Sequence, residues 1–187
     1  MNIVLNVTET ERWSVLTQCI EGELCLAEEI ESEKGNGTYV VKDTCPLPLV
    51  EKLLSEKRPN KIVIFYQQAE VYIAESINDG MPIASASEQW LLKIQKLIEI
   101  QKRNRSKIIL INAEQACTEV GRLNQLLNNS GISFIENIEI KEIAETFFLL
   151  LAAHFVVQQK NIKIFNFAPA SVESSPATKG NKLYLIF

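Results

Sequence analysis

The chain has 187 residues, a length typical of one domain, and it is 47% hydrophobic and 22% charged, as ordinary soluble proteins are. Its formal net charge of −4 argues against a general nucleic-acid binder, which normally presents a basic face. The first residues lack the pattern of a signal peptide, and the longest apolar run, residues 147–157, is too short for a membrane span, so we expect a cytoplasmic protein.

Five apolar segments have the composition of β-strands. In chain order they are residues 3–7, 39–42, 62–66, 108–112 and a weaker segment at 132–135. The middle segments are continuous β-branched runs without alternation between apolar and polar residues. That pattern is typical of strands that are covered on both faces, as in a parallel sheet.

Helical patterns separate these strands. They cover residues 11–20, 46–56, 69–78, 85–103, 119–128 and 139–159. In the helix expected over 85–103, apolar residues recur at three- and four-residue steps, and Ser85 or Ser87 can cap its start. Strands alternating with helices predict a single parallel-sheet, three-layer α/β domain over residues 1–168. Residues 169–187 form a tail rich in Ser, Pro and Gly whose last residues have the pattern of a strand.

In an open α/β sheet, ligands bind beyond the carboxyl ends of the strands. The candidate positions are therefore residues 6–12, 42–46, 66–68 and 112–114. A metal site is not expected, because the cysteines have no metal-ligand spacing with the single histidine, His154. We expect all four thiols to be structural and His154 to be part of an apolar helix rather than a catalytic base. The cysteines are Cys19, Cys25, Cys45 and Cys117.

Five motifs follow one another in a distinctive order. They are YVVKDTCP, IVIFYQQAEVYIAES, SEQWLLKIQKLIEIQKRNR, KIILINAEQ and LLNNSGIS. This order resembles the sulfotransferase family, P-loop-like enzymes that use 3′-phosphoadenosine 5′-phosphosulfate, and in particular its bacterial members attached to polysaccharide-synthesis proteins. The resemblance spans roughly residues 1–150 and implies a P-loop-like fold. The positions that it assigns to ligand binding are Arg12, Lys42, Asp43, Tyr66, Gln67, Gln68 and Ser76, with Ala74 as the alternative to Ser76.

The residues at these positions depart from those that bind the cofactor. The first junction, VLNVTETERW, has no glycine and carries Glu9 and Glu11. A carboxylate at 4 Å repels one phosphate charge by about 4 kcal/mol at an effective dielectric near 20. Tyr66, Gln67 and Gln68 stand where the family has Arg-Asp-Pro, and neutral groups make hydrogen bonds roughly half as strong as charged ones. Lys42 and Asp43 match the family, but such a pair is more typical of a surface salt bridge.

We therefore expect a non-catalytic, sulfotransferase-like domain with no cofactor. It would act as a scaffold or interaction module linked to surface-polysaccharide synthesis, with a protein partner or a second copy of the chain as its ligand. One alternative is an active sulfotransferase, or another transferase, whose unusual anionic-donor site uses Arg12, Lys42 and Ser76. The other is a small-ligand sensor that binds through Tyr66, Gln67 and Gln68.

Two charged clusters lie outside the strand ends. The carboxylates at 28, 29, 31 and 33 are typical of a solvated acidic face. The basic cluster at 102, 103, 105 and 107 complements the dipole of the preceding helix and favours solubility, and it could also bind an anionic partner.

Overall fold

The structure, a computed structural model, describes residues 1–135 except residues 9, 34 and 57–58. The helix expected over 139–159 with His154, the apolar run 147–157, and the tail 169–187 lie outside the described residues, as does Glu9.

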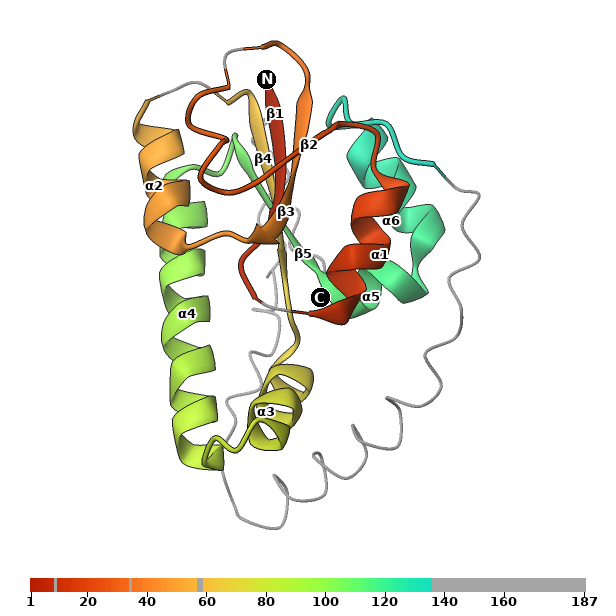
Figure 1. Cartoon of the computed structure of the whole chain (residues 1–187). Coiled ribbons are helices and arrows are strands. Elements are labelled where there is room, and N and C mark those ends of the chain that lie inside the picture. Colours follow the sequence, from red (N-terminus) through yellow and green to blue (C-terminus); the bar gives the residue numbers. More distant parts are fainter. Residues whose placement is uncertain (9, 34, 57–58, 136–187) are drawn as a thin grey trace, which may run out of the picture.

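Five parallel strands form one sheet in the order β2-β3-β1-β4-β5, which confirms the expected parallel-sheet α/β fold (Figure 1). The strands are β1 (Asn2–Asn6), β2 (Glu23–Cys25), β3 (Thr38–Thr44), β4 (Lys61–Tyr66) and β5 (Ile108–Asn112). Strand β2 was not expected from the sequence. The strand expected over 132–135 is wrong, because this segment makes one isolated antiparallel bridge, between Ile20 and Phe134.

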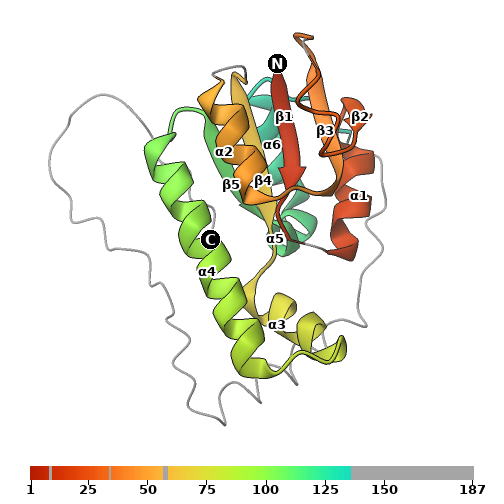
Figure 2. The ribbon, with the colours of Figure 1, turned by 60° about the vertical axis from the view of Figure 1, so that its left-hand side comes forward.

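Helices cover both faces of the sheet, giving three layers (Figure 1). One face carries α2 (Leu47–Ser55) and α4 (Ile83–Arg103), and the other carries α1 (Glu11–Cys19), α5 (Ala113–Thr118) and α6 (Val120–Asn128). Helix α3 (Ala69–Asn78) lies beside the first half of α4, beyond the carboxyl edge of the sheet (Figure 2). None of the described helices is long and apolar enough to cross a bilayer.

The start of α4 differs from the expectation. Pro82 occupies the N-cap position with φ −60°, so neither Ser85 nor Ser87 caps the helix. Proline suits this position because its ring fixes φ near −65° and it has no N–H that would need an acceptor.

Alternate residues of the central strands point to opposite faces of the sheet. Ile3 and Leu5 of β1 pack in the cluster formed with α2 and α4, whereas Val4 packs in the cluster formed with α1 and α6. This two-sided burial explains why the strands read as continuous apolar runs. Trp13 anchors α1 to the sheet, because its ring lies 5.3 Å from that of Phe65 and its Nε1 donates to the Val41 carbonyl at 3.0 Å. The anchored helix places Arg12 at the carboxyl edge of the sheet.

Candidate functional site at the carboxyl edge of the sheet

The gap between the carboxyl ends of β1 and β4 is the topological switch point of the sheet. From β1 the chain passes through α1 to β2, whereas from β4 it passes through α3 and α4 to β5 on the opposite side. Strands β1 and β4 are direct neighbours, so their connections diverge at this point. Open α/β sheets bind their ligands at such a switch point.

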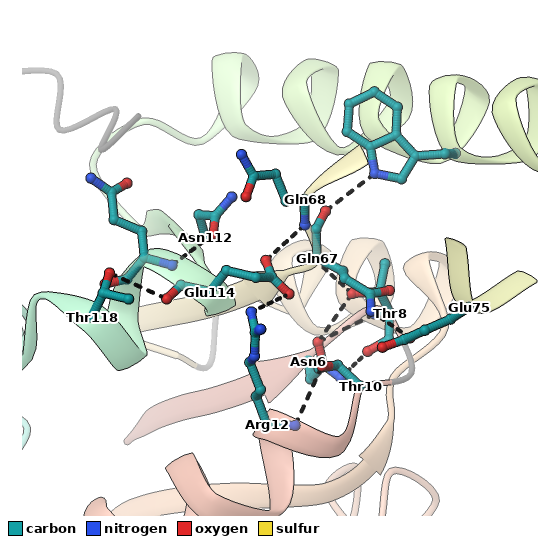
Figure 3. Close-up of polar contacts among 12 residues, drawn as sticks. Asn6, Thr8, Thr10, Arg12, Gln67, Gln68, Glu75, Asn112, Glu114 and Thr118 are labelled. Carbon is teal, nitrogen blue, oxygen red and sulfur yellow. Dashed lines mark hydrogen bonds and ion pairs between the residues drawn. The ribbon is translucent and has the colours of Figure 1, made fainter. Parts of the chain in front are cut away.

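Buried polar side chains from β1 and β4 fill the switch point (Figure 3). Asn6, Thr8 and Gln67 have no more than 1% of their surface exposed. The hydroxyl Oγ1 of Thr8 accepts from the backbone N–H of Gln67 at 2.8 Å, and Asn6 Oδ1 accepts from the backbone N–H of Thr8 at 3.3 Å. The strand ends are therefore joined by the protein's own hydrogen bonds.

An ion pair from the other side of the sheet completes this network (Figure 3). Arg12 Nη1, at the start of α1, lies 3.3 Å from Glu114 Oε1, at the start of α5. The second carboxylate oxygen, Oε2, accepts from the backbone N–H of Gln68 at 2.8 Å. Glu114 thus occupies the position beside Arg12 and the strand-end N–H that an anionic ligand would need.

The start of α5 places Glu114 in this position. Asn112, the last residue of β5, caps α5 by accepting from the backbone N–H of Gln115 at 2.9 Å. The helix therefore begins immediately after the strand, with Glu114 in its first turn. A carboxylate in the first turn is also favoured by the helix dipole.

Helices α3 and α4 contribute the remaining contacts. Gln67 Nε2 donates to Glu75 Oε2 on α3 at 2.5 Å, and Trp90 Nε1 on α4 donates to the Gln67 carbonyl at 3.2 Å. The side-chain oxygen of Gln67 is buried and accepts no hydrogen bond from the described residues. Of the polar groups of Gln67, the side-chain oxygen is therefore the one left open to a small donor.

Burial governs the titration of this network. Burial raises the pKa of Glu114, although the N–H groups of Gln68 and Glu114 and the Arg12 guanidinium oppose the shift. The pKa of Tyr66 is raised by burial and, to a smaller extent, by the charge of Glu114. Burial therefore outweighs the support that Arg12 and the two N–H groups give to the ionised form of Glu114.

Three of the positions assigned by the family resemblance come together at the switch point: Arg12, Gln67 and Gln68. Tyr66 lies at the end of β4, opposite Asn112 of β5. Ser76 lies half-buried on α3, and Ala74, the alternative to it, is also half-buried. Within the described part of the chain, Ser76 makes no hydrogen bond to Arg12, and the methyl side chain of Ala74 cannot make one.

Lys42 and Asp43 lie apart from this group. Val4 of β1 lies opposite Val40 of β3, but Asn6 lies opposite Thr44 rather than Lys42, so the register shifts between these two pairs. Both Lys42 and Asp43 are exposed. The salt bridge expected between them is wrong: successive strand residues point to opposite faces, and Asp43 instead accepts from the backbone N–H of Ala27 at 2.8 Å.

No family model matches the chain, and no curated protein or solved structure is detectably similar to it. The residues of the site must therefore carry any assignment of function.

The cysteines form no part of the site. Cys19, Cys25 and Cys45 are buried and Cys117 is half-buried, and all four are free thiols. Burial raises the pKa of each one, to about 12 for Cys45 and to about 11 for Cys25 and for Cys117. Among the described residues, no group of three or more His, Cys, Asp or Glu side chains could hold a metal ion.

Several residues of the network were not assigned a role from the sequence. Asn6, Thr8 and Glu114 lie in the selected strand-end segments, whereas Glu75 lies within α3, past the end of the segment 66–68. In the sequence, a polar residue that directly follows a buried strand indicates such a position. The hydrogen-bond partners of that residue depend on the order of the strands in the folded sheet.

Proposed function

We propose that the chain is a non-catalytic, sulfotransferase-like domain that acts as a scaffold or interaction module. Its switch point would hold the protein together instead of holding a nucleotide. The link to surface-polysaccharide synthesis belongs to the same proposal and rests on the family resemblance.

The ion pair between Arg12 and Glu114 carries this proposal. A phosphate or sulfate ligand at the switch point would need a cation and free backbone N–H donors. Arg12 is already paired with Glu114, and the N–H of Gln68 already donates to the same carboxylate. An incoming anion would have to displace a buried carboxylate of like charge, which costs free energy that the neutral side chains nearby cannot offset.

The two alternatives have less support. A transferase site made of Arg12, Lys42 and Ser76 would need these side chains to converge, and Lys42 lies exposed past the register shift in β3. A sensor that uses Tyr66, Gln67 and Gln68 would have few free groups at the switch point. The backbone N–H, the backbone carbonyl and the side-chain N–H of Gln67 already bond to Thr8, Trp90 and Glu75, and the backbone N–H of Gln68 already bonds to Glu114.

Thermal unfolding in the presence of adenosine 3′,5′-bisphosphate tests the proposal. A ligand that binds only the folded protein stabilises it by about 2.7 kcal/mol at 100 times its Kd, which is readily seen as a rise in Tm. We expect no rise at about 1 mM nucleotide, because a ligand whose Kd exceeds about 1 mM stabilises the folded protein by less than about 0.4 kcal/mol at that concentration. A clear rise would overturn the proposal and favour the transferase.

The variant Glu114→Gln sharpens the same experiment. It removes the competing charge, leaves Arg12 in place and keeps an oxygen that can accept from Gln68. We expect this variant to respond to the nucleotide more strongly than the wild type. Glu119→Gln is the matched control, since Glu119 is an exposed partner of Arg122 and should leave the response unchanged.

A further inference from the structure

The sheet has an acidic edge strand that carries exposed leucines. Strand β2 lies at one end of the sheet and pairs with β3 alone among the described residues. Leu24 is 49% exposed and Leu26 is 39% exposed. Residues 13–33 contain six glutamates and no lysine or arginine. Natural edge strands are commonly protected from pairing by short length, charge, lysine or proline; β2 has three residues and carries Glu23, but it has neither lysine nor proline.

Three exposed glutamates lie at or near this edge. Glu21, Glu23 and Glu28 are exposed and make no ion pair with the described residues. Glu21 and Glu23 lie at the amino end of β2. Glu28 instead follows the carboxyl end of β2.

The opposite edge of the sheet has the complementary charge at the same end. Strand β5 pairs with β4 alone within the described part of the chain. Its amino end follows the basic segment 102–107, which holds four lysines and arginines and no acidic residue. Lys102 and Arg105 are exposed and form no ion pair with described residues. Because all strands are parallel, the amino ends of β2 and β5 lie along the same border of the sheet.

The two edges also match in their apolar side chains. Leu24 lies opposite Val40, and Ile109 of β5 lies opposite Val63. Val40 and Val63 belong to the same core cluster, so Leu24 and Ile109 project from the same face of the sheet at its two ends. Ile109 is half-buried, so each edge offers apolar surface on that face.

We propose that β2 of one copy of the chain pairs with β5 of a second copy, in parallel orientation, so that the sheet continues from one molecule to the next. The parallel orientation brings the acidic amino end of β2 beside the basic amino end of β5, whereas the antiparallel orientation separates them. The contact joins two different surfaces, so a pair of copies still presents one β2 edge and one β5 edge, and association proceeds head to tail. This inference does not rest on the proposed function, because association is measured without any nucleotide.

Sedimentation velocity of the full chain tests the proposal. A contact between two short edges buries little surface and is weak, so we expect the sedimentation coefficient to rise as the protein goes from about 10 μM to about 1 mM. The rise should disappear in about 1 M NaCl, where charges are screened beyond about 3 Å. A chain that sediments as a monomer at every concentration in low salt would overturn the proposal.

Charge exchange identifies the two surfaces. The double variant Glu21→Lys/Glu23→Lys has two basic edges, and the double variant Lys102→Glu/Arg105→Glu has two acidic edges. Each alone should remain monomeric, and an equimolar mixture should associate again because every contact is then complementary. Association of either variant alone at the wild-type level, or a monomeric mixture of variants whose circular dichroism matches the wild type, would contradict the pairing.

Two further variants control for net charge and for folding. Asp79→Lys/Glu88→Lys changes the charge as much as the first double variant does, at exposed positions away from both edges, and should associate as the wild type does. Leu24→Asp leaves Lys102 and Arg105 intact and should weaken association, because it places a charge where an apolar contact is expected. Loss of association in the Asp79→Lys/Glu88→Lys control, or wild-type association of Leu24→Asp, would rule out this interface.

Discussion

Arg12 on α1 lies 3.3 Å from the carboxylate of Glu114 on α5, and the same carboxylate accepts from the backbone of Gln68 between β4 and α3. One side chain thus joins the ends of three segments that are distant in the chain. The side chains of Arg12 and Glu114 are 13% and 8% exposed, so solvent screens the pair far less than it screens a surface salt bridge.

Replacing Arg12 with Gln should destabilise the protein by about 2 kcal/mol, because it leaves the buried carboxylate of Glu114 without its cation. The measurement is the free energy of unfolding in urea near neutral pH. Arg122→Gln is the control, since Arg122 pairs with Glu119 at 3.0 Å on the surface and its loss should cost less than about 0.5 kcal/mol. Equal losses in the two variants would show that the buried pair contributes no more than an exposed one.

The titration of Glu114 should contribute to the pH dependence of the free energy of unfolding. Burial raises the pKa of this carboxyl in the folded protein above its ordinary value of 4.5. The contribution of Glu114 to the free energy of unfolding is therefore fully present below pH 4.5 and is lost as the pH rises through the pKa of the folded state. The stability of the wild type minus that of Glu114→Gln should therefore be largest near about pH 4 and decrease toward about pH 8.

Glu119 provides a control of opposite sign for the same titration. Hydrogen bonds from Gln115 and Arg122 lower the pKa of Glu119, so its contribution is present above its ordinary pKa and is lost as the pH falls. The difference between the wild type and Glu119→Gln should accordingly increase with pH. Urea unfolding at a series of pH values measures both differences, and a difference for Glu114→Gln that grows with pH would contradict the expected direction.

Thr8→Val tests the link between β1 and β4. Valine has nearly the shape of threonine but removes the oxygen that accepts from the Gln67 N–H, and an unpaired buried N–H costs about 1–3 kcal/mol. Thr8→Ser keeps the oxygen and should lose less. Thr44→Val, at an exposed position of β3, should change the free energy of unfolding by less than about 0.5 kcal/mol. A loss in Thr8→Val no larger than in Thr44→Val would mean that the hydrogen bond contributes little.

The thiols should be nearly inert in the folded protein. With pKa values of about 11 for Cys25 and for Cys117, only about 0.1% of each is thiolate at pH 8, and the raised pKa of Cys45, about 12, makes it less reactive still. We expect slow reaction with a disulfide reagent in native buffer and rapid reaction of all four thiols in urea. Cys117, the one half-buried thiol, should react first in the native protein. A native thiol that reacts as fast as in urea would contradict this burial.

The fold was predictable where burial on two sides leaves a local trace. The runs at β1, β4 and β5 are apolar at every buried position except the asparagines that end β1 and β5, so their composition alone indicates strands. Strand β2 has the sequence Glu-Leu-Cys and no such run, because it forms only where β3 offers a pairing partner. Helix α5 has six residues, too few for an apolar stripe to stand out. Asn112 as a capping residue and Glu114 in the first turn are nevertheless typical of the start of a helix.

The site was predictable as a location but not as a set of contacts. The rule that ligands meet strand ends selected Arg12, Gln67 and Gln68 correctly as neighbours at the carboxyl edge. The pairing of Arg12 with Glu114 needs α1 and α5 on the same face of the sheet, and no local pattern encodes which face a helix covers. The exclusion of Lys42 from the site depends on a register shift that is equally invisible in the sequence.

The central position of β1 makes the described sheet cooperative. Its neighbours β3 and β4 pair with it on either side, and they do not pair with each other. If β1 detached, the sheet would separate into two isolated ribbons, β2 with β3 and β4 with β5, and two-stranded ribbons are at best marginally stable in water. The backbone amides of β1 should therefore exchange with solvent only when the whole domain unfolds, whereas those of β2 can open locally at the edge.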